Sequence, residues 1–309
     1  MNNNGILVSV IMSVYNSEKY VEESVRSIMK QSYSNLEVLI ADDCSTDNSY
    51  EILLKLANED SRIKIIKNEH NLKLAKTLNK LIKLAKGKYI ARMDSDDIAL
   101  PERIEKQVYF LENNYDIDFC GTNAFWINEK NKKIGKSYLP ITSFDCKYYF
   151  RFGNTFIHPS ILIKSSVLKE DLYSESFRYA QDYELWGRLL FKKNKNGANL
   201  TERLMLYRIC NTQASFSHRE EQSSLASSVL DMYEIMGKAN LDLHKRLFFQ
   251  HKWTDLSFSI LKMNLQYVHK NICAYSRIVY MNLLKMTLRK KNPFFILYCL
   301  LHYPFRLHE

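Results

Sequence analysis

The chain has 309 residues, of which 46% are hydrophobic and 25% are charged, and its formal net charge at pH 7 is +10. This length predicts about two structural units. The composition is close to the globular average, which argues against wholesale disorder, a fibrous repeat or a small disulfide scaffold. The longest apolar runs, 6–15 and 294–301, reach about half of the 18 or more residues that a membrane-spanning helix needs. We therefore expect a globular protein that does not span a bilayer.

Two further features bear on where the protein works. Residues 1–5 carry no positive charge and no small-residue cleavage site follows the apolar run, so a secretory signal is unsupported and a cytoplasmic location is expected. The six cysteines lie far apart and form no C-x-x-C pair, which argues against a zinc knuckle or a redox dithiol. They are expected to be reduced, mostly buried thiols.

The positive charge is concentrated at the C-terminal end. Residues 238–309 contain 12 Lys or Arg and three Asp or Glu, a net charge of +9, so the preceding residues carry only +1. The pattern beyond residue 222 is helical almost throughout. We therefore expect a near-neutral domain, 1–222, followed by a basic helical region, 223–309.

The first half of the chain alternates strand and helix patterns. A β-branched apolar run over 8–15 is typical of a strand that is buried on both faces, and helical spacing of apolar residues follows over 20–29. Strand patterns then recur over 36–41, 63–66, 89–93 and 118–127, separated by helical patterns over 48–56, 74–85 and 101–111. This alternation predicts an α/β fold with a mostly parallel sheet and right-handed crossovers.

Acidic residues follow two of these strands. Asp42 and Asp43 end one strand, and Asp94, Asp96 and Asp97 end another, where ligands of parallel sheets usually bind. Three acids so close together repel one another unless a cation lies among them, and carboxylate oxygens suit Mg²⁺ or Mn²⁺. An isolated D-x-D is more often a solvated acidic turn. Two acidic groups at one sheet edge favour the metal site.

Four segments together resemble family 2 glycosyltransferases in order and spacing. They are Val8-Ser-Val-Ile-Met-Ser-Val-Tyr-Asn16, Ala41-Asp-Asp-Cys-Ser-Thr-Asp47, Gly87-Lys-Tyr-Ile-Ala-Arg-Met-Asp-Ser-Asp-Asp97 and Ala180-Gln-Asp-Tyr-Glu-Leu-Trp186. The resemblance covers about residues 6–215 and implies a GT-A, Rossmann-like fold and an inverting transfer from a UDP-sugar to a saccharide acceptor. The product expected from the resemblance is a cell-surface polysaccharide, such as an O-antigen, a capsule or a lipooligosaccharide. Because a Q-x-x-R-W motif is missing, one sugar per encounter is expected.

The resemblance also implies roles for single residues. Asp43 is expected to accept from the uracil ring, and the full set of donor-binding residues is Ser13, Tyr15, Asp42, Asp43, Asn71, Asp94, Ser95 and Asp96. Asp96, Asp97 and His158 are the expected ligands of Mn²⁺ or Mg²⁺. The alternatives are helix capping for the pair at 42 and 43, and a structural role for the histidine.

Asp182 is the expected catalytic base, at the position where relatives carry a Glu-Asp pair and this chain has Gln181 before the aspartate. An aspartate at a helix N-terminus is the alternative reading, and Glu184 and His158 are the next candidates for the base. Arg208 either reaches a phosphate or forms a surface ion pair. The loop after Asn71 departs from the family, because relatives usually carry a glycine soon after this asparagine.

Residues 238–309 interleave Lys and Arg with Phe, Tyr, Trp and Leu, a composition that fits an interfacial helix on an anionic membrane. Such contact at the inner face of the cytoplasmic membrane would suit a lipid-linked acceptor. The alternative is a helical subdomain with a solvated basic rim. Two other function classes stay open. A nucleic-acid-binding protein is disfavoured by acids at the strand ends, and a nucleotidyltransferase is disfavoured because no Gly-rich phosphate loop is present.

Overall fold

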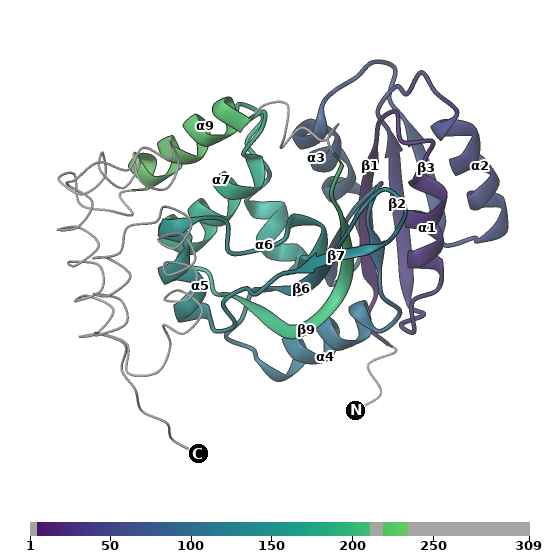
Figure 1. The fold of residues 1–309 in the computed structure, drawn as a ribbon. Coiled ribbons are helices and arrows are strands. Elements are labelled where there is room, and N and C mark those ends of the chain that lie inside the picture. Colours follow the sequence, from purple (N-terminus) through teal and green to yellow (C-terminus); the bar gives the residue numbers. More distant parts are fainter. Residues whose placement is uncertain (1–4, 211–218, 234–309) are drawn as a thin grey trace, which may run out of the picture. The chain divides into compact units, whose positions relative to one another are not determined.

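A nine-stranded sheet organises the residues that the computed structural model describes, which are 5–210 and 219–233 (Figure 1). Its strand order is β3-β2-β1-β4-β8-β6-β9-β5, and β7 pairs with β6. The strands are β1 (Val8–Val14), β2 (Leu36–Asp42), β3 (Ile63–Lys67), β4 (Tyr89–Asp94), β5 (Ile98–Ala99), β6 (Phe119–Ile127), β7 (Lys133–Lys136), β8 (Leu162–Lys164) and β9 (Gly197–Arg208).

The first four strands are parallel and are connected by the helices α1 (Val21–Met29), α2 (Ser49–Glu59) and α3 (Leu74–Leu84). Because the chain moves outward from β1 to β3 and then returns across the sheet to β4, right-handed crossovers place α1 and α2 on one face and α3 on the other. Strands β1 and β2 are buried almost throughout, as their apolar sequences predict. The mostly parallel α/β sheet expected from the sequence is confirmed.

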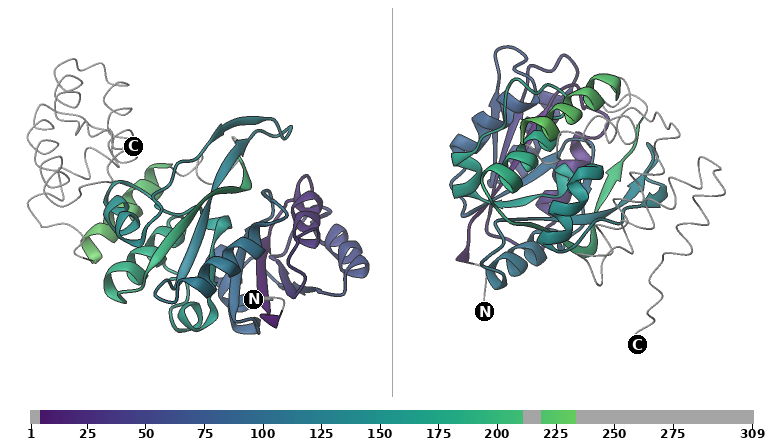
Figure 2. Two further views of the ribbon diagram at one scale, coloured as in Figure 1. Left: turned by 90° about the horizontal axis from the view of Figure 1, so that it is seen from below. Right: turned by 90° about the vertical axis from the view of Figure 1, so that its left-hand side faces the viewer.

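The second half of the sheet mixes directions. Strand β8 is antiparallel to both β4 and β6, β6 is parallel to β9, and the short β5 is antiparallel to β9. Figure 2 shows β6 and β7 as a hairpin that extends from the sheet. The remaining helices are α4 (Arg103–Asn113), α5 (Ser143–Tyr149), η2 (Phe150–Phe152), η3 (His158–Ser160), α6 (Ser165–Glu170), α7 (Gln181–Gly187), the π-helical η4 (Arg188–Lys192) and α9 (Arg219–Met232).

The glycine at position 87 lets two neighbouring strands approach closely. A Cβ atom on Gly87 would lie 2.6 Å from the backbone N of Ser9, so any larger residue would push β1 away from the turn before β4. Helix α3 has already ended at Leu84. This close packing fixes β1 beside β4, and both strands end at the edge of the sheet where acidic residues lie.

One compact unit extends from Met1 to Met236. Its last described helix, α9, runs across residue 222, where the sequence suggested a boundary, and packs against α7 through a hydrogen bond from Tyr233 Oη to Glu184 Oε1. Residues 237–309, including the expected membrane-binding region, lie outside the described residues. None of the described helices combines the length and the hydropathy needed to cross a membrane.

Candidate active site

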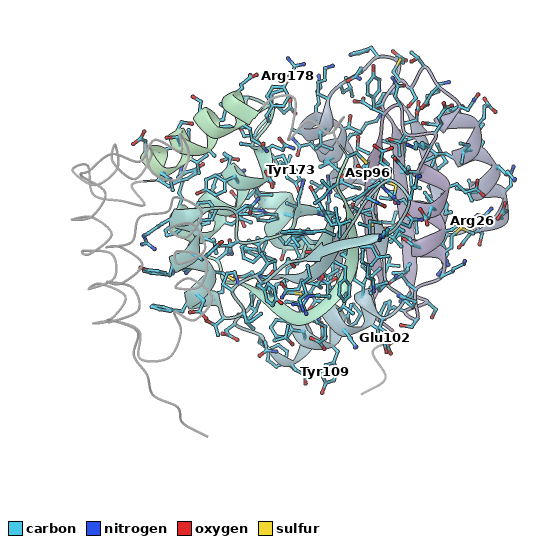
Figure 3. All side chains as sticks on the ribbon, in the orientation of Figure 1. Arg26, Asp96, Glu102, Tyr109, Tyr173 and Arg178 are labelled. Atoms are coloured by element: carbon cyan, nitrogen blue, oxygen red, sulfur yellow. The ribbon has the colours of Figure 1, made fainter. Side chains whose placement is uncertain are left out.

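A cleft of about 840 Å³ opens at the carboxyl ends of the parallel strands. One side is lined by residues that follow β1, β2, β3 and β4, and the other by residues from the second half of the chain, including the start of α7. Asp96 lies beside the parallel strands, whereas Arg178 lies toward α7 (Figure 3). The cleft therefore brings residues of the first four strands together with residues that lie far from them in the sequence, such as Asp96 with Arg178.

Most of the expected donor-binding residues line the first side. Ser13, near the end of β1, is paired in register with Asp94 at the end of β4. Tyr15 follows β1 with 48% of its surface exposed. The other members of the set that line the cleft are Asp43, Asn71, Ser95 and Asp96.

Asp43 is held in place by the loop before α3. Its Oδ1 accepts hydrogen bonds from the side chain of Asn68 and from the N–H of Leu72, both at 2.8 Å, and its Oδ2 accepts one from the N–H of Lys73 at 2.9 Å. A carboxylate has about four acceptor positions, so these three bonds leave one open on a residue that lines the cleft. The backbone of Lys73 has dihedral angles of φ 71° and ψ 162° where its N–H donates to Asp43.

Asp42 does not line the cleft. It is fully buried, its Oδ2 accepts a hydrogen bond from the N–H of Ser45 at 3.2 Å, and its Oδ1 has no partner among the described residues. Successive side chains of a strand face opposite sides, so the end of β2 can present only one of the two neighbouring aspartates to a ligand. The structure therefore does not bring Asp42 to the predicted donor site.

Three carboxylates form a compact cluster after β4. Each of Asp94, Asp96 and Asp97 offers one oxygen within 4.8 Å of the others. Asp97 is buried, its Oδ1 accepts the N–H of Arg208 at 2.7 Å, and no group in the described part of the chain is hydrogen-bonded to its Oδ2. Burial, followed by the charges of Asp96 and Asp94, raises the pKa of Asp97 well above its usual range. A buried carboxylate oxygen without a partner, beside two further carboxylates, fits a divalent cation.

Buried arginines position this cluster. Arg92 lines the cleft and forms an ion pair with Asp94. Arg208 is buried, donates from Nε to the carbonyl oxygen of Asp96 at 2.7 Å and from Nη2 to Glu23 at 3.0 Å. It does not line the cleft, so it does not fit the phosphate contact considered from the sequence, and the ion pair that it forms with the exposed Glu23 is made from a buried position. Its contacts hold the backbone of the acidic turn instead.

His158 lines the cleft but is not a member of the carboxylate cluster. Its Nε2 lies 2.6 Å from the hydroxyl of Tyr173. Burial, followed by the nearby charge of Arg92, lowers the pKa of His158 well below 6.5, so the ring is neutral at pH 7. This environment supports a structural role for the histidine, and its predicted role as a metal ligand stays a prediction.

Asp182 lies in the first turn of α7 and lines the cleft. Its Oδ2 accepts a hydrogen bond from the side chain of Asn154 at 2.7 Å. Burial raises the pKa of Asp182, and hydrogen bonds from the N–H of Tyr183 and from Asn154 oppose this shift. A carboxylate with a raised pKa is a better proton acceptor than an exposed one, which suits general base catalysis.

Glu184, the next candidate for the base, does not line the cleft. Its side chain is 2% exposed and is bound by Arg188 at 2.8 Å and by the hydroxyl of Tyr233 at 2.5 Å. An i,i+2 spacing in a helix directs two side chains to different faces, which explains why Asp182 and Glu184 diverge. Glu184 therefore has a structural role.

Several residues of the cleft were not predicted from the sequence. Asn154 binds the candidate base, Arg92 pairs with the carboxylate cluster, and Trp126 and Tyr207 line the second side. The sequence could have indicated Arg92, because it lies two residues before Asp94 on β4. Residues two apart on a strand point to the same face of the sheet. The other three belong to no short motif. Trp126 and Tyr207 are paired in the register of β6 with β9, and Asn154 lies in the segment before η3.

Comparisons with known proteins agree with this geometry. Residues 9–170 match the model of Glycosyl transferase family 2. An uncharacterized glycosyltransferase of Methanocaldococcus jannaschii is 38% identical over 220 residues, which cover 70% of this chain and 75% of that protein. The O-antigen biosynthesis glycosyltransferase WbnJ of Escherichia coli is 38% identical over 66% of this chain and 80% of its own length. The Escherichia coli UDP-Glc:alpha-D-GlcNAc-diphosphoundecaprenol beta-1,3-glucosyltransferase WfaP is 32% identical over 60% of this chain and 71% of its own.

Two solved structures share the fold. TarS of S. aureus in complex with UDP-GlcNAc aligns with a TM-score of 0.61 and 21% identity, over 79% of this chain and 71% of that chain. The mannosyltransferase PcManGT of Pyrobaculum calidifontis, in complex with GDP-Man and Mn2+, aligns with a TM-score of 0.59 and 14% identity, over 96% of this chain and 83% of that chain. The expected GT-A architecture is thus confirmed. By its family match and its relatives, this chain belongs to glycosyl transferase family 2 and is a glycosyltransferase.

Proposed function

We propose that the enzyme transfers one sugar from a UDP-sugar to a hydroxyl of a saccharide acceptor, with inversion at the anomeric carbon. The observation that carries this proposal is that one cleft is lined both by Asp182, a carboxylate with a raised pKa, and by carboxylates of a cluster that fits a divalent cation. A single displacement needs these two functions at once.

Asp94, Asp96 and Asp97 would hold Mg²⁺ or Mn²⁺, which neutralises charge on a departing diphosphate. In the proposed step, the oxygen of the acceptor hydroxyl forms a bond to the anomeric carbon while the bond from that carbon to the diphosphate oxygen breaks. The hydroxyl proton passes to Asp182, and the electron pair of the broken bond leaves with UDP. Asn154 keeps the carboxylate oriented toward the cleft during this transfer.

The substrate classes are inferred from the relatives. The name of WfaP gives UDP-Glc as the donor and a GlcNAc diphosphate linked to undecaprenol as the acceptor. WbnJ is named as an enzyme of O-antigen biosynthesis, and TarS has been solved in complex with UDP-GlcNAc. We therefore propose a UDP-hexose donor, a saccharide acceptor linked to a lipid diphosphate, and a cell-surface polysaccharide as the product. The open acceptor position of Asp43 is suited to a ring N–H of uracil.

A screen of UDP-sugars tests this proposal. Wild-type protein is incubated with each donor, with and without Mn²⁺, and with an alkyl diphosphate of GlcNAc as acceptor. We expect one donor to stabilise the protein against heating most strongly and to be consumed, since stabilisation grows with ligand concentration relative to its dissociation constant. The anomeric configuration of the product is then read by NMR. Retention of configuration would exclude the single displacement.

We also propose that residues 238–309 bring the enzyme to the inner face of the cytoplasmic membrane. The support is their net charge of +9 and their many aromatic residues. Deletion of 238–309 should reduce binding to vesicles that contain anionic lipid, and added salt should weaken binding of the full chain. Equal binding by the truncated and full-length proteins would contradict this role.

A further inference from the structure

Gln181 is a polar residue of the cleft that the proposed reaction does not use. It precedes Asp182 in the first turn of α7, lines the cleft, and is 9% exposed. Its Oε1 is buried and has no hydrogen-bond partner among the described residues. Most buried polar atoms in folded proteins are paired, so an unpaired amide oxygen at a ligand cavity requires an explanation.

The assignment of oxygen and nitrogen in a side-chain amide does not change this conclusion. Rotation of the amide by 180° would exchange Oε1 and Nε2. In either orientation a polar atom of Gln181 occupies this buried position while the residue lines the cleft. A molecule in the cleft can supply this partner, because Gln181 lines the cleft and no described side chain or backbone group is bonded to its Oε1.

We infer that Gln181 binds a hydroxyl group of the acceptor saccharide. This inference rests on the proposed function, because it takes Asp182 as the base that receives the acceptor's proton. The expected donor-binding residues follow β1, β2, β3 and β4, whereas Gln181 comes from α7 together with Asp182. Because Gln181 and Asp182 both line the cleft, an acceptor whose reacting hydroxyl meets Asp182 can also contact Gln181.

The amide has a chemical advantage over a carboxylate at this position. It accepts a hydrogen bond from a sugar hydroxyl and can donate one in return. Being neutral, it adds no negative charge beside Asp182, and a second carboxylate there would favour protonation of the base. Gln181 is thus a specificity-determining residue that leaves the titration of Asp182 undisturbed.

The test uses Gln181→Met, which is similar in size and removes both polar atoms. The control is Thr155→Val, because Thr155 is also buried with an unpartnered Oγ1 but does not line the cleft. Both variants remove an unpaired buried polar atom, so both melting temperatures should rise, by about 2–4 °C. Full-length proteins are assayed with UDP-glucose and an alkyl diphosphate of GlcNAc, and UDP with Mn²⁺ serves as the probe of the donor side.

Gln181→Met should lower kcat/KM for the acceptor about threefold to tenfold, the effect expected of one neutral hydrogen bond, while its affinity for UDP stays unchanged. Thr155→Val should keep both values. Gln181→Glu, which retains an acceptor oxygen, should recover part of the acceptor discrimination but move the acidic limb of the pH profile to higher pH.

Three results would overturn the inference. The first is an unchanged kcat/KM for the acceptor in Gln181→Met, and the second is a parallel loss of UDP affinity, which would place Gln181 on the donor side. The third is a lower melting temperature in Gln181→Met, which would show that the amide supports the fold. If wild-type enzyme does not turn over this substrate pair, the proposed substrates are wrong, and the melting temperatures together with UDP affinity still decide the role of Gln181.

Discussion

Asn154 donates its side-chain amide to Oδ2 of Asp182 at 2.7 Å, across 28 positions of sequence. The same asparagine accepts the N–H of Phe156 at 3.2 Å, so its own orientation is fixed by the backbone. This pair holds the candidate base in one position before substrate arrives, and it stabilises the ionised form of the carboxyl.

Asn154→Ala should therefore shift the pH dependence of the reaction. A base works only when it is deprotonated, so activity falls as the pH drops through the pKa of Asp182. The hydrogen bond from Asn154 lowers this pKa, and its removal leaves the upward effect of burial less opposed. The acidic limb of kcat/KM should move to higher pH, whereas Asn113→Ala, on the exposed end of α4, should leave it in place. A limb that moves to lower pH would contradict the assignment of Asp182.

Asp182→Asn and Glu184→Gln should separate catalysis from stability. The first removes the base but keeps its size, so turnover should fall by about 10² to 10⁴ while UDP affinity is retained. Because the folded-state pKa of Asp182 is raised, its ionised form opposes folding at pH 7, and the melting temperature of Asp182→Asn should not fall.

Glu184→Gln should show the reverse result. It breaks the buried ion pair with Arg188, so the melting temperature should fall by several degrees while turnover of the folded protein stays near normal. Steady-state kinetics and thermal unfolding of both variants provide the measurement. Loss of turnover in Glu184→Gln at temperatures well below its unfolding would reverse the two roles.

Metal dependence follows from the carboxylate cluster. Mn²⁺ alone should raise the melting temperature of the wild type, because binding relieves repulsion among three carboxylates, and excess EDTA should stop transfer. Asp96→Asn should lose both the thermal shift with Mn²⁺ and the Mn²⁺-dependent part of UDP binding. Asp116→Asn, an exposed acid outside the cluster, is the matched control. Full activity of the wild type in EDTA would exclude the metal's role.

The sequence predicted the first side of the cleft because local patterns determine it. Buried parallel strands such as β1 and β4 are recognisable from apolar runs, and the residues that follow them must meet at one edge. Asp42 shows the limit of this reasoning, since the alternation of side chains at the end of β2 decides which of two aspartates reaches the cleft.

The second side depends on contacts between distant segments. Trp126 lies on β6, whose partner in parallel pairing is β9, and irregular register between these strands cannot be read from spacing. Asn154 acquires its function only because α7 brings Asp182 to it. His158 was expected from the resemblance to bind the metal, but in the structure its Nε2 lies 2.6 Å from the hydroxyl of Tyr173, a contact between distant positions of the sequence.

The backbone of Lys73 provides the last prediction. At φ 71° and ψ 162° it occupies a region that is almost restricted to glycine and costs other residues about 1–3 kcal/mol. The conformation points the N–H of Lys73 at Oδ2 of Asp43, at 2.9 Å, and at Oδ1 of Asn71, at 3.0 Å. The strain is therefore stored where the loop holds an expected donor-binding carboxylate.

Lys73→Gly should relieve this strain and keep both hydrogen bonds. Glycine also makes the unfolded chain more flexible, which opposes folding by about 0.5–1 kcal/mol, so the net gain should be about 0.5–2 kcal/mol. Lys73→Ala is the matched control, because it removes the same long side chain but retains the Cβ atom that causes the strain. In thermal and urea unfolding, the glycine variant should be more stable than both the wild type and the alanine variant. Equal stability of the two variants would show that the backbone at position 73 relaxes to an unstrained conformation, and that Asp43 is held without stored strain.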